Sequence, residues 1–187
     1  GNSGPYTFGP RVAARVAQQA SQLAERRSAS LLVTSSARTS ASALRAFEQH
    51  LSVPYDLYRW QPDGDENPYF GILGLSDALV VTADSVSMLS EACATGNEVY
   101  MAALGGYGYP MRPQHDMPGD FRLSGLTYSW MMRYGHPRLS RDLRLFHQAL
   151  LQQGRAVWLG DQFAEPPRQP EESDMARAVM RVKALFD

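Results

Sequence analysis

Short apolar runs alternate with segments of helical periodicity through the first hundred residues, and this alternation constrains the fold more than any other feature. Four segments have the spacing or flanking residues of a helix: 10–27, 41–50, 68–75 and 86–96. Four apolar runs are typical of buried strands: 30–34, 55–60, 77–82 and 98–103. Strands that alternate with helices form a parallel sheet covered by helices on both faces. The sequence therefore predicts an α/β, Rossmann-like fold, with residues 1 to about 104 in one parallel sheet.

The second half of the chain is less regular. Residues 105–138 are rich in Gly, Pro, Met and Tyr without a clear period, which predicts a loop-rich insertion. Its aromatic side chains favour burial against another surface, so we expect the most mobile or most partner-dependent part of the chain here. A helix over 141–153, an edge strand over 156–159 and a terminal helix within 173–187 should follow. We interpret residues 1–187 as a single domain.

Composition excludes several classes of function. The formal net charge of −1 offers no basic stripe for nucleic acid or an anionic membrane. The single cysteine, Cys93, suits a reducing compartment, so a cytoplasmic location is expected. The four histidines lack metal-ligand spacing, and neither a dinucleotide nor a P-loop fingerprint occurs in its proper context. No apolar run approaches the roughly 20 residues of a membrane span. We expect no metal, no cofactor, no nucleic acid partner and no transmembrane segment.

The segment after the strongest strand, 77–82, is the most informative about function. A small-residue turn leads there into a helix N-terminus, whose outward N–H groups and dipole favour an anion. Ser85 and Ser87 could add hydroxyl donors, and Glu91 shares the face of Ser87, where its carboxylate could accept both hydroxyls of a ribose. The alternative is that Asp84 or Ser85 only caps the helix while Glu91 faces solvent. From spacing alone, the cap is favoured.

The polar loops of the first half all follow predicted strands. Ligands of such sheets bind beyond the carboxyl ends of the strands, so these loops should gather at one rim, with Arg38 and Ser85 on the same side of the domain. The residues placed near this rim are Ser3, Ser35, Arg38, Asn67, Asp84, Ser85 and Ser87.

Two stretches carry a resemblance to a known family. Thr-Ala-Asp-Ser-Val-Ser-Met-Leu-Ser-Glu-Ala at 82–92, with Gly-Asn-Ser-Gly at 1–4, resembles bacterial relatives of the plant Elm-type mitochondrial-fission protein. More distantly, the region is similar to the C-terminal domain of GT-B glycosyltransferases, where a glycine-rich loop and a helix tip hold a donor diphosphate. The family tends to carry Ser-Arg-Arg-Thr where this chain keeps one cation, Arg38. The resemblance implies Ser3 and Gly4 in that loop, Ser85 and Ser87 at the phosphates, and Glu91 at the ribose. Together with the rim residues Ser35, Arg38 and Asn67, these are the predicted nucleotide-binding residues.

The resemblance also implies a function and leaves a rival open. It implies a nucleoside-diphosphate-sugar site, of uridine type, on a domain separated from an N-terminal acceptor domain, so that the chain alone binds nucleotide without turning it over. The rival is a non-catalytic adaptor, because the plant relative is associated with recruiting a dynamin-type fission protein. Peripheral association with the inner membrane stays open under either. An intact rim of Arg38, Ser85, Ser87 and Glu91 favours nucleotide, whereas a blocked rim beside an exposed apolar insertion favours an adaptor.

Overall fold

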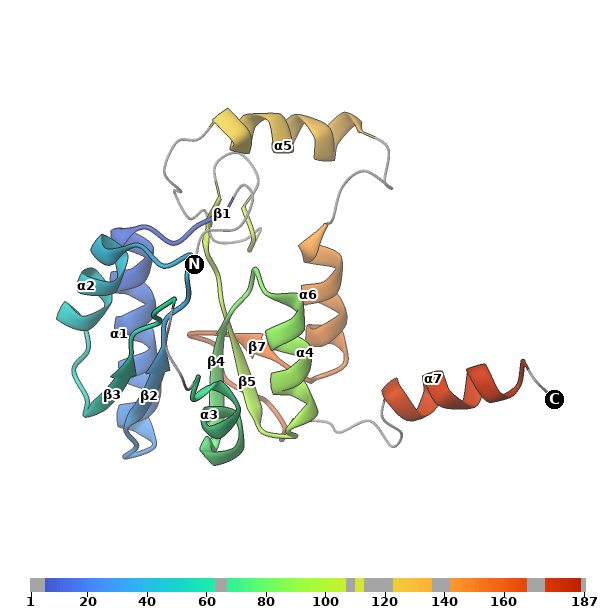
Figure 1. Ribbon diagram of the computed structural model, residues 1–187, viewed down its shortest axis with the longest axis horizontal. Coiled ribbons are helices and arrows are strands. Elements are labelled where there is room, and N and C mark those ends of the chain that lie inside the picture. Colours follow the sequence, from blue (N-terminus) through green and yellow to red (C-terminus); the bar gives the residue numbers. More distant parts are fainter. Residues whose placement is uncertain are drawn as a thin grey trace.

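The computed structural model describes residues 6–62, 67–106, 110–112, 123–135, 142–167 and 174–185. Its strands are β1 (Tyr6–Thr7), β2 (Leu31–Thr34), β3 (Tyr55–Tyr58), β4 (Ala78–Thr82), β5 (Glu98–Ala102), β6 (Gly105–Gly106) and β7 (Val157–Trp158). Its helices are α1 (Pro10–Arg26), α2 (Ala41–Gln49), α3 (Tyr69–Leu75), α4 (Val86–Ala94), α5 (Leu123–Tyr134), α6 (Leu143–Gln152) and α7 (Asp174–Lys183). Figure 1 shows α1 and α2 beside β2 and β3, and α4 and α6 beside β4 and β5. The predicted α/β, Rossmann-like alternation is confirmed.

The strands form parallel sheets, but they do not form one sheet. β2 pairs with β3 in parallel, from Leu31 opposite Tyr55 to Thr34 opposite Tyr58. β4, β5 and β7 form a second parallel sheet in that order, and β1 pairs with β6 in an antiparallel ladder. Within the described residues no ladder joins β2 to β4, so the expectation of one sheet over residues 1 to about 104 is wrong. The physical reason is a cavity that lies between these two strands.

The core lies between the helices and the β4–β5–β7 sheet. α1 turns a stripe of buried side chains inward, and Pro10 stands in its first turn, where a missing N–H costs nothing. α4 buries Leu89 and Cys93 against the sheet, and Met101 in β5 is fully enclosed. Burial raises the pKa of the Cys93 thiol, which makes it a core residue rather than a nucleophile. α4, which carries part of the rim described below, is therefore packed against this core.

The region 105–138 contains a helix that the sequence analysis missed. The prediction of irregular structure is wrong for Leu123–Tyr134, which form α5. Leu123, Leu126, Trp130 and Tyr134 recur at steps of three and four, but Gly125 weakens the helical propensity of the segment. Three of these side chains are highly exposed, namely Leu123 at 72%, Trp130 at 68% and Tyr134 at 70%. Dependence of this region on a partner stays a prediction.

α7 provides the terminal helix that was predicted within 173–187. It stands apart from the body of the domain in Figure 1, and its apolar side chains Val179, Met180 and Val182 are exposed. None of the helices in the described ranges has both the length and the apolar character needed to cross a membrane.

Candidate functional site

Ser85 begins α4 and is its N-cap. Its Oγ accepts a hydrogen bond from the Met88 N–H at 3.4 Å, which stabilises the helix start, and lies 3.4 Å from Ser87 Oγ. Of the two caps considered from the sequence, Ser85 rather than Asp84 fills the role. A hydroxyl that accepts a hydrogen bond still carries its own donor, so capping leaves Ser85 able to bind an anion.

Asp84, immediately before the cap, carries a buried charge. Its side chain is 0% exposed, and neither carboxylate oxygen accepts a hydrogen bond from the described residues. Arg38 Nη2 lies 3.5 Å from Asp84 Oδ2, and the Arg38 side chain is 55% exposed. This ion pair joins the loop after β2 to the turn after β4. Arg38 and Ser85 consequently lie on the same side of the domain.

Ser35 and Asn67 make local structural contacts. Ser35 Oγ accepts the Trp60 N–H at 2.8 Å, which ties the end of β2 to the end of β3. Asn67 Oδ1 accepts the Tyr69 N–H at 3.1 Å at the start of α3. In both contacts the side chain accepts a hydrogen bond from a backbone N–H group. The two contacts therefore hold the backbone of the rim loops in place. Ser3 and Gly4, the other two residues implied by the resemblance, lie outside the described residues.

Glu91 is held by a residue that the sequence analysis did not select. The Tyr69 hydroxyl donates to Glu91 Oε2 at 2.5 Å and so connects α3 to α4. Burial, followed by this hydrogen bond to a carboxylate, raises the pKa of Tyr69 above its ordinary value. Only its place beside Asn67 in a polar loop could have pointed to Tyr69. Glu91 thus lies on an exposed face, as the alternative interpretation required, yet it has a defined orientation.

His147 contacts the turn between β4 and α4. It is 1% exposed on α6, and its Nε2 donates to the Ala83 carbonyl oxygen at 2.6 Å. Burial lowers the pKa of His147, against the opposing effects of the bond to Ala83 and the charges of Asp142 and Asp84. The neutral imidazole holds Ala83, the residue before Asp84, in place. The sequence showed His147 at helical spacing from Leu143 and Leu150, which indicates this inward face.

Acidification below about pH 6.5, the ordinary histidine pKa, is expected to lower the free energy of unfolding through His147. The unfolded imidazole takes up a proton near that pH while the folded one does not, so stability is full above it and falls as pH decreases. One group contributes at most about 1.4 kcal/mol per pH unit. Urea unfolding at several pH values measures the slope. His147→Gln should make the free energy of unfolding depend less steeply on pH, whereas His50→Gln, at an exposed position, should leave that slope unchanged. Equal slopes in the two variants would contradict the role given to His147.

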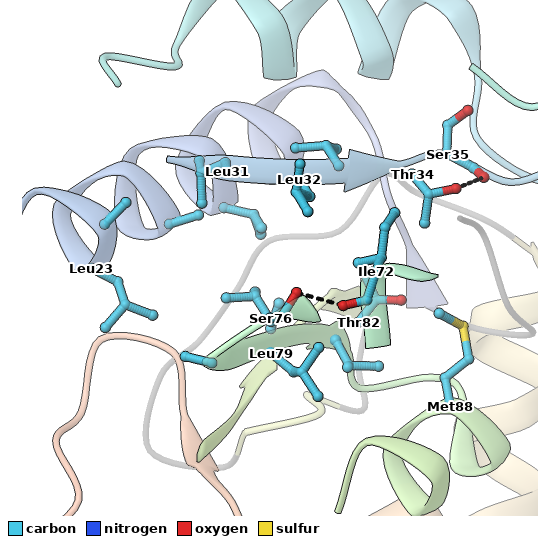
Figure 2. Close-up of a pocket in the computed structure, with 18 of the residues that line it drawn as sticks. Leu23, Leu31, Leu32, Thr34, Ser35, Ile72, Ser76, Leu79, Thr82 and Met88 are labelled. Carbon is cyan, nitrogen blue, oxygen red and sulfur yellow. Dashed lines mark hydrogen bonds between the residues drawn. The ribbon is translucent and has the colours of Figure 1, made fainter. Parts of the chain in front are cut away.

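A cavity of about 830 Å³ runs from this rim between β2 and β4. Its polar end is lined by Ser35, Arg38 and Ser85, and Tyr69 also lines it. Figure 2 shows the remainder, where apolar side chains such as Leu23, Leu32 and Leu79 face the space. Asn67, Ser87 and Glu91 are not part of its lining. Among the described residues, no three His, Cys, Asp or Glu side chains gather as metal ligands would.

Comparison with known proteins identifies the family. Residues 1–119 match the family model described as "Mitochondrial fission ELM1". The "Mitochondrial fission protein ELM1" of Arabidopsis thaliana is 47% identical over 73 residues, which are 38% of this chain and 17% of that protein, so the chain spans only a small part of its relative. No solved structure matches significantly. Because the family model covers well over half of the sequence, this chain belongs to the mitochondrial fission ELM1 family.

Proposed function

We propose that the rim binds the diphosphate of a nucleoside-diphosphate sugar, with a uridine-type donor as the first candidate. The observation that carries the proposal is the meeting of Arg38, Ser85 and the α4 N-terminus at the polar end of one cavity. A guanidinium fork matches phosphate oxygens, and a helix N-terminus directs N–H groups and a positive dipole toward an anion. Each of these groups stabilises negative charge.

The buried carboxylate of Asp84 has a defined part in this proposal. It lies 3.5 Å from Arg38 and orients the guanidinium over the turn that begins α4. It also reduces the positive potential there, because it is a negative charge removed from water. A guanidinium has five N–H donors in all, so Arg38 can keep its ion pair with Asp84 and still donate to a phosphate oxygen.

Glu91 is proposed to bind the ribose. Its exposed carboxylate lies on α4, which Ser85 caps, and the Tyr69 hydroxyl donates to one of its oxygens at 2.5 Å. The other oxygen can accept a ribose hydroxyl. Tyr69 therefore positions Glu91 and limits the rotamer freedom that would be lost on binding. Transfer of the sugar would need acceptor-side groups on another domain, so we propose donor binding without turnover for this chain.

An adaptor role is the second candidate, and α5 favours it. Leu123, Trp130 and Tyr134 present large apolar side chains to solvent, and exposed apolar groups of this kind mark protein or membrane contacts. None of these three side chains is part of the lining of the cavity. Donor binding and an adaptor role therefore make distinct claims about different parts of the molecule.

Glu91→Ala is expected to weaken binding of uridine diphosphate about ten- to a hundredfold, since a hydrogen bond to a charged group contributes roughly 1.5–3 kcal/mol. Calorimetric titration measures the effect. Stability should barely change, because alanine has the higher helix propensity. The matched control is Tyr69→Phe, which keeps the ring, frees Glu91 and should cause a smaller loss. Absence of binding by the parent chain at millimolar nucleotide would refute the proposal, and equal binding by Glu91→Ala would refute the role of Glu91.

A further inference from the structure

Both strands that border the cavity have an open edge. Within the described ranges β2 pairs only with β3, and β4 pairs only with β5. All residues of β2 and of β4 line the cavity, so it is bounded on two sides by sheet edges. Backbone groups at such edges are strong hydrogen-bonding groups, and burying them without partners is costly. A β-strand is suited to satisfy a whole row of them at once, because its own N–H and C=O groups repeat at the same spacing.

Alternation along each strand identifies the groups that face the cavity. Leu31 and Ser35 donate their N–H groups to β3, and Ala83 donates to β5. Since successive residues of a strand direct their backbone groups to opposite sides, the intervening residues point the other way. We name their N–H groups the slot-facing amides: those of Leu32, Thr34, Val80 and Thr82.

The two edges run in the same direction. Figure 2 shows β2 and β4 extending alongside each other, with Thr34 and Thr82 at corresponding ends of the cavity. The Arg38–Asp84 ion pair joins the loops that follow those ends. A strand parallel to both would therefore find N–H and C=O partners on each side, as in the interior of a parallel sheet.

The helix that closes the cavity indicates where such a strand lies in the sequence. Val16, Ala20 and Leu23 of α1 line the cavity, and α1 leads directly into β2. A strand, a helix packed over it and a neighbouring parallel strand form the right-handed βαβ unit. α1 and β2 match the last two members of such a unit, whose first member would precede α1.

The described residues ahead of α1 do not provide that first member. Tyr6 and Thr7 are already paired with β6. The five residues ahead of them, Gly-Asn-Ser-Gly-Pro, have the composition of a turn and not of a buried strand. The aligned segment forms only 17% of the plant relative, which therefore has ample further polypeptide.

We infer that the cavity between β2 and β4 is the seat of a parallel β-strand from the polypeptide that precedes residue 1 in the natural protein. About five residues, spanning roughly 16 Å, would match the neighbouring strands. They would be apolar on both faces, because α1 and α3 contribute apolar side chains such as Leu23 and Ile72 to the lining. The two parallel sheets then become one, in the order β3, β2, inserted strand, β4, β5, β7. The strand would occupy the apolar part of the cavity, whereas the proposed nucleotide site is its polar end.

Hydrogen exchange tests the inference on two chains, the 187 residues alone and the same residues extended by the natural polypeptide ahead of residue 1. The slot-facing amides should exchange at least tenfold more slowly in the extended chain. The amides of Val33 and Val81, which point to β3 and β5, are the internal controls and should be protected in both. Equally fast exchange of the slot-facing amides in both chains overturns the inference. Protection in the shorter chain that appears only with dimerisation also overturns it, because a second copy is then the occupant.

Proline variants give a second readout that does not depend on exchange rates. Val80→Pro removes a slot-facing amide, which an open edge tolerates but an interior strand does not. The loss in free energy of unfolding should therefore be larger in the extended chain than in the 187 residues alone. Val81→Pro removes an amide that points to β5 and should be severe in both. Equal losses for Val80→Pro in the two chains would overturn the inserted strand.

Discussion

Leu89→Ala is expected to lower the free energy of unfolding by about 2–5 kcal/mol. Leu89 is fully buried, and it lies one turn after Ser85 on the face of α4 that packs on the sheet. The substitution removes its apolar contacts and leaves a space that the rigid neighbours fill only in part. Denaturant unfolding measures the loss as a lower midpoint at unchanged slope.

The matched control for Leu89 is a leucine on a helix surface. Leu145 of α6 is 67% exposed, so Leu145→Ala should change the free energy of unfolding by no more than about 0.5 kcal/mol. Comparable losses of unfolding free energy in the two variants would show that α4 does not pack against the core through Leu89. Because α4 carries Ser85, Ser87 and Glu91, the same packing fixes the geometry of the proposed nucleotide site.

The fold was predictable where the pattern of the sequence is local. Val12, Val16 and Ala20 recur at helical steps in α1, and the apolar run ending at Thr82 marks β4, so these elements follow from spacing alone. Predicted and observed bounds of the helices and strands differ by at most about three residues, and several coincide, since mainly the ends of elements fray. α5 was missed because its apolar positions, including Trp130, stand among glycine and methionine with no polar face opposite.

Pairing between strands was less predictable, because it depends on what lies between them. The sequence indicates strands at β2 and β4 and even their common direction. It contains no signal that these two strands leave a space between them. A parallel sheet is assembled by tertiary contacts. That β2 has no hydrogen-bonded neighbour on one edge among the described residues becomes visible only in three dimensions.

In the candidate site, too, the positions of the loops were predictable from the sequence and the contacts between side chains were not. The rule that ligand-binding loops lie at the carboxyl ends of strands indicated one edge for Arg38 and Ser85, and both line the cavity there. The side-chain pairs were not predictable. Asp84 could be read as a helix cap, whereas it is buried against Arg38, and Tyr69 reaches Glu91 from another helix. Such contacts depend on rotamers and on helix packing, which sequence spacing does not specify.

Arg38→Ala is expected to weaken binding of uridine diphosphate about ten- to a hundredfold, because a hydrogen bond between charged groups contributes roughly 1.5–3 kcal/mol. Arg38→Lys keeps the charge but loses the planar fork, so it should recover only part of the affinity. Isothermal titration of the three proteins measures the series. Unchanged affinity in Arg38→Ala, in a parent that binds, would remove Arg38 from the site.

The same substitution should also reduce stability, and a second change separates the two effects. Without Arg38, the buried Asp84 carboxylate loses the ion-pair partner that the described residues give it. Because the Arg38 side chain is 55% exposed and its charge is screened by solvent, we expect the free energy of unfolding to fall by about 1–2 kcal/mol. Adding Asp84→Asn to Arg38→Ala removes the uncompensated charge and should restore most of that stability. It should not restore nucleotide affinity, because the phosphate still lacks its guanidinium. If affinity and stability recover together in the double variant, Arg38 acts only by neutralising the charge of Asp84, and the α4 N-terminus alone binds the phosphate.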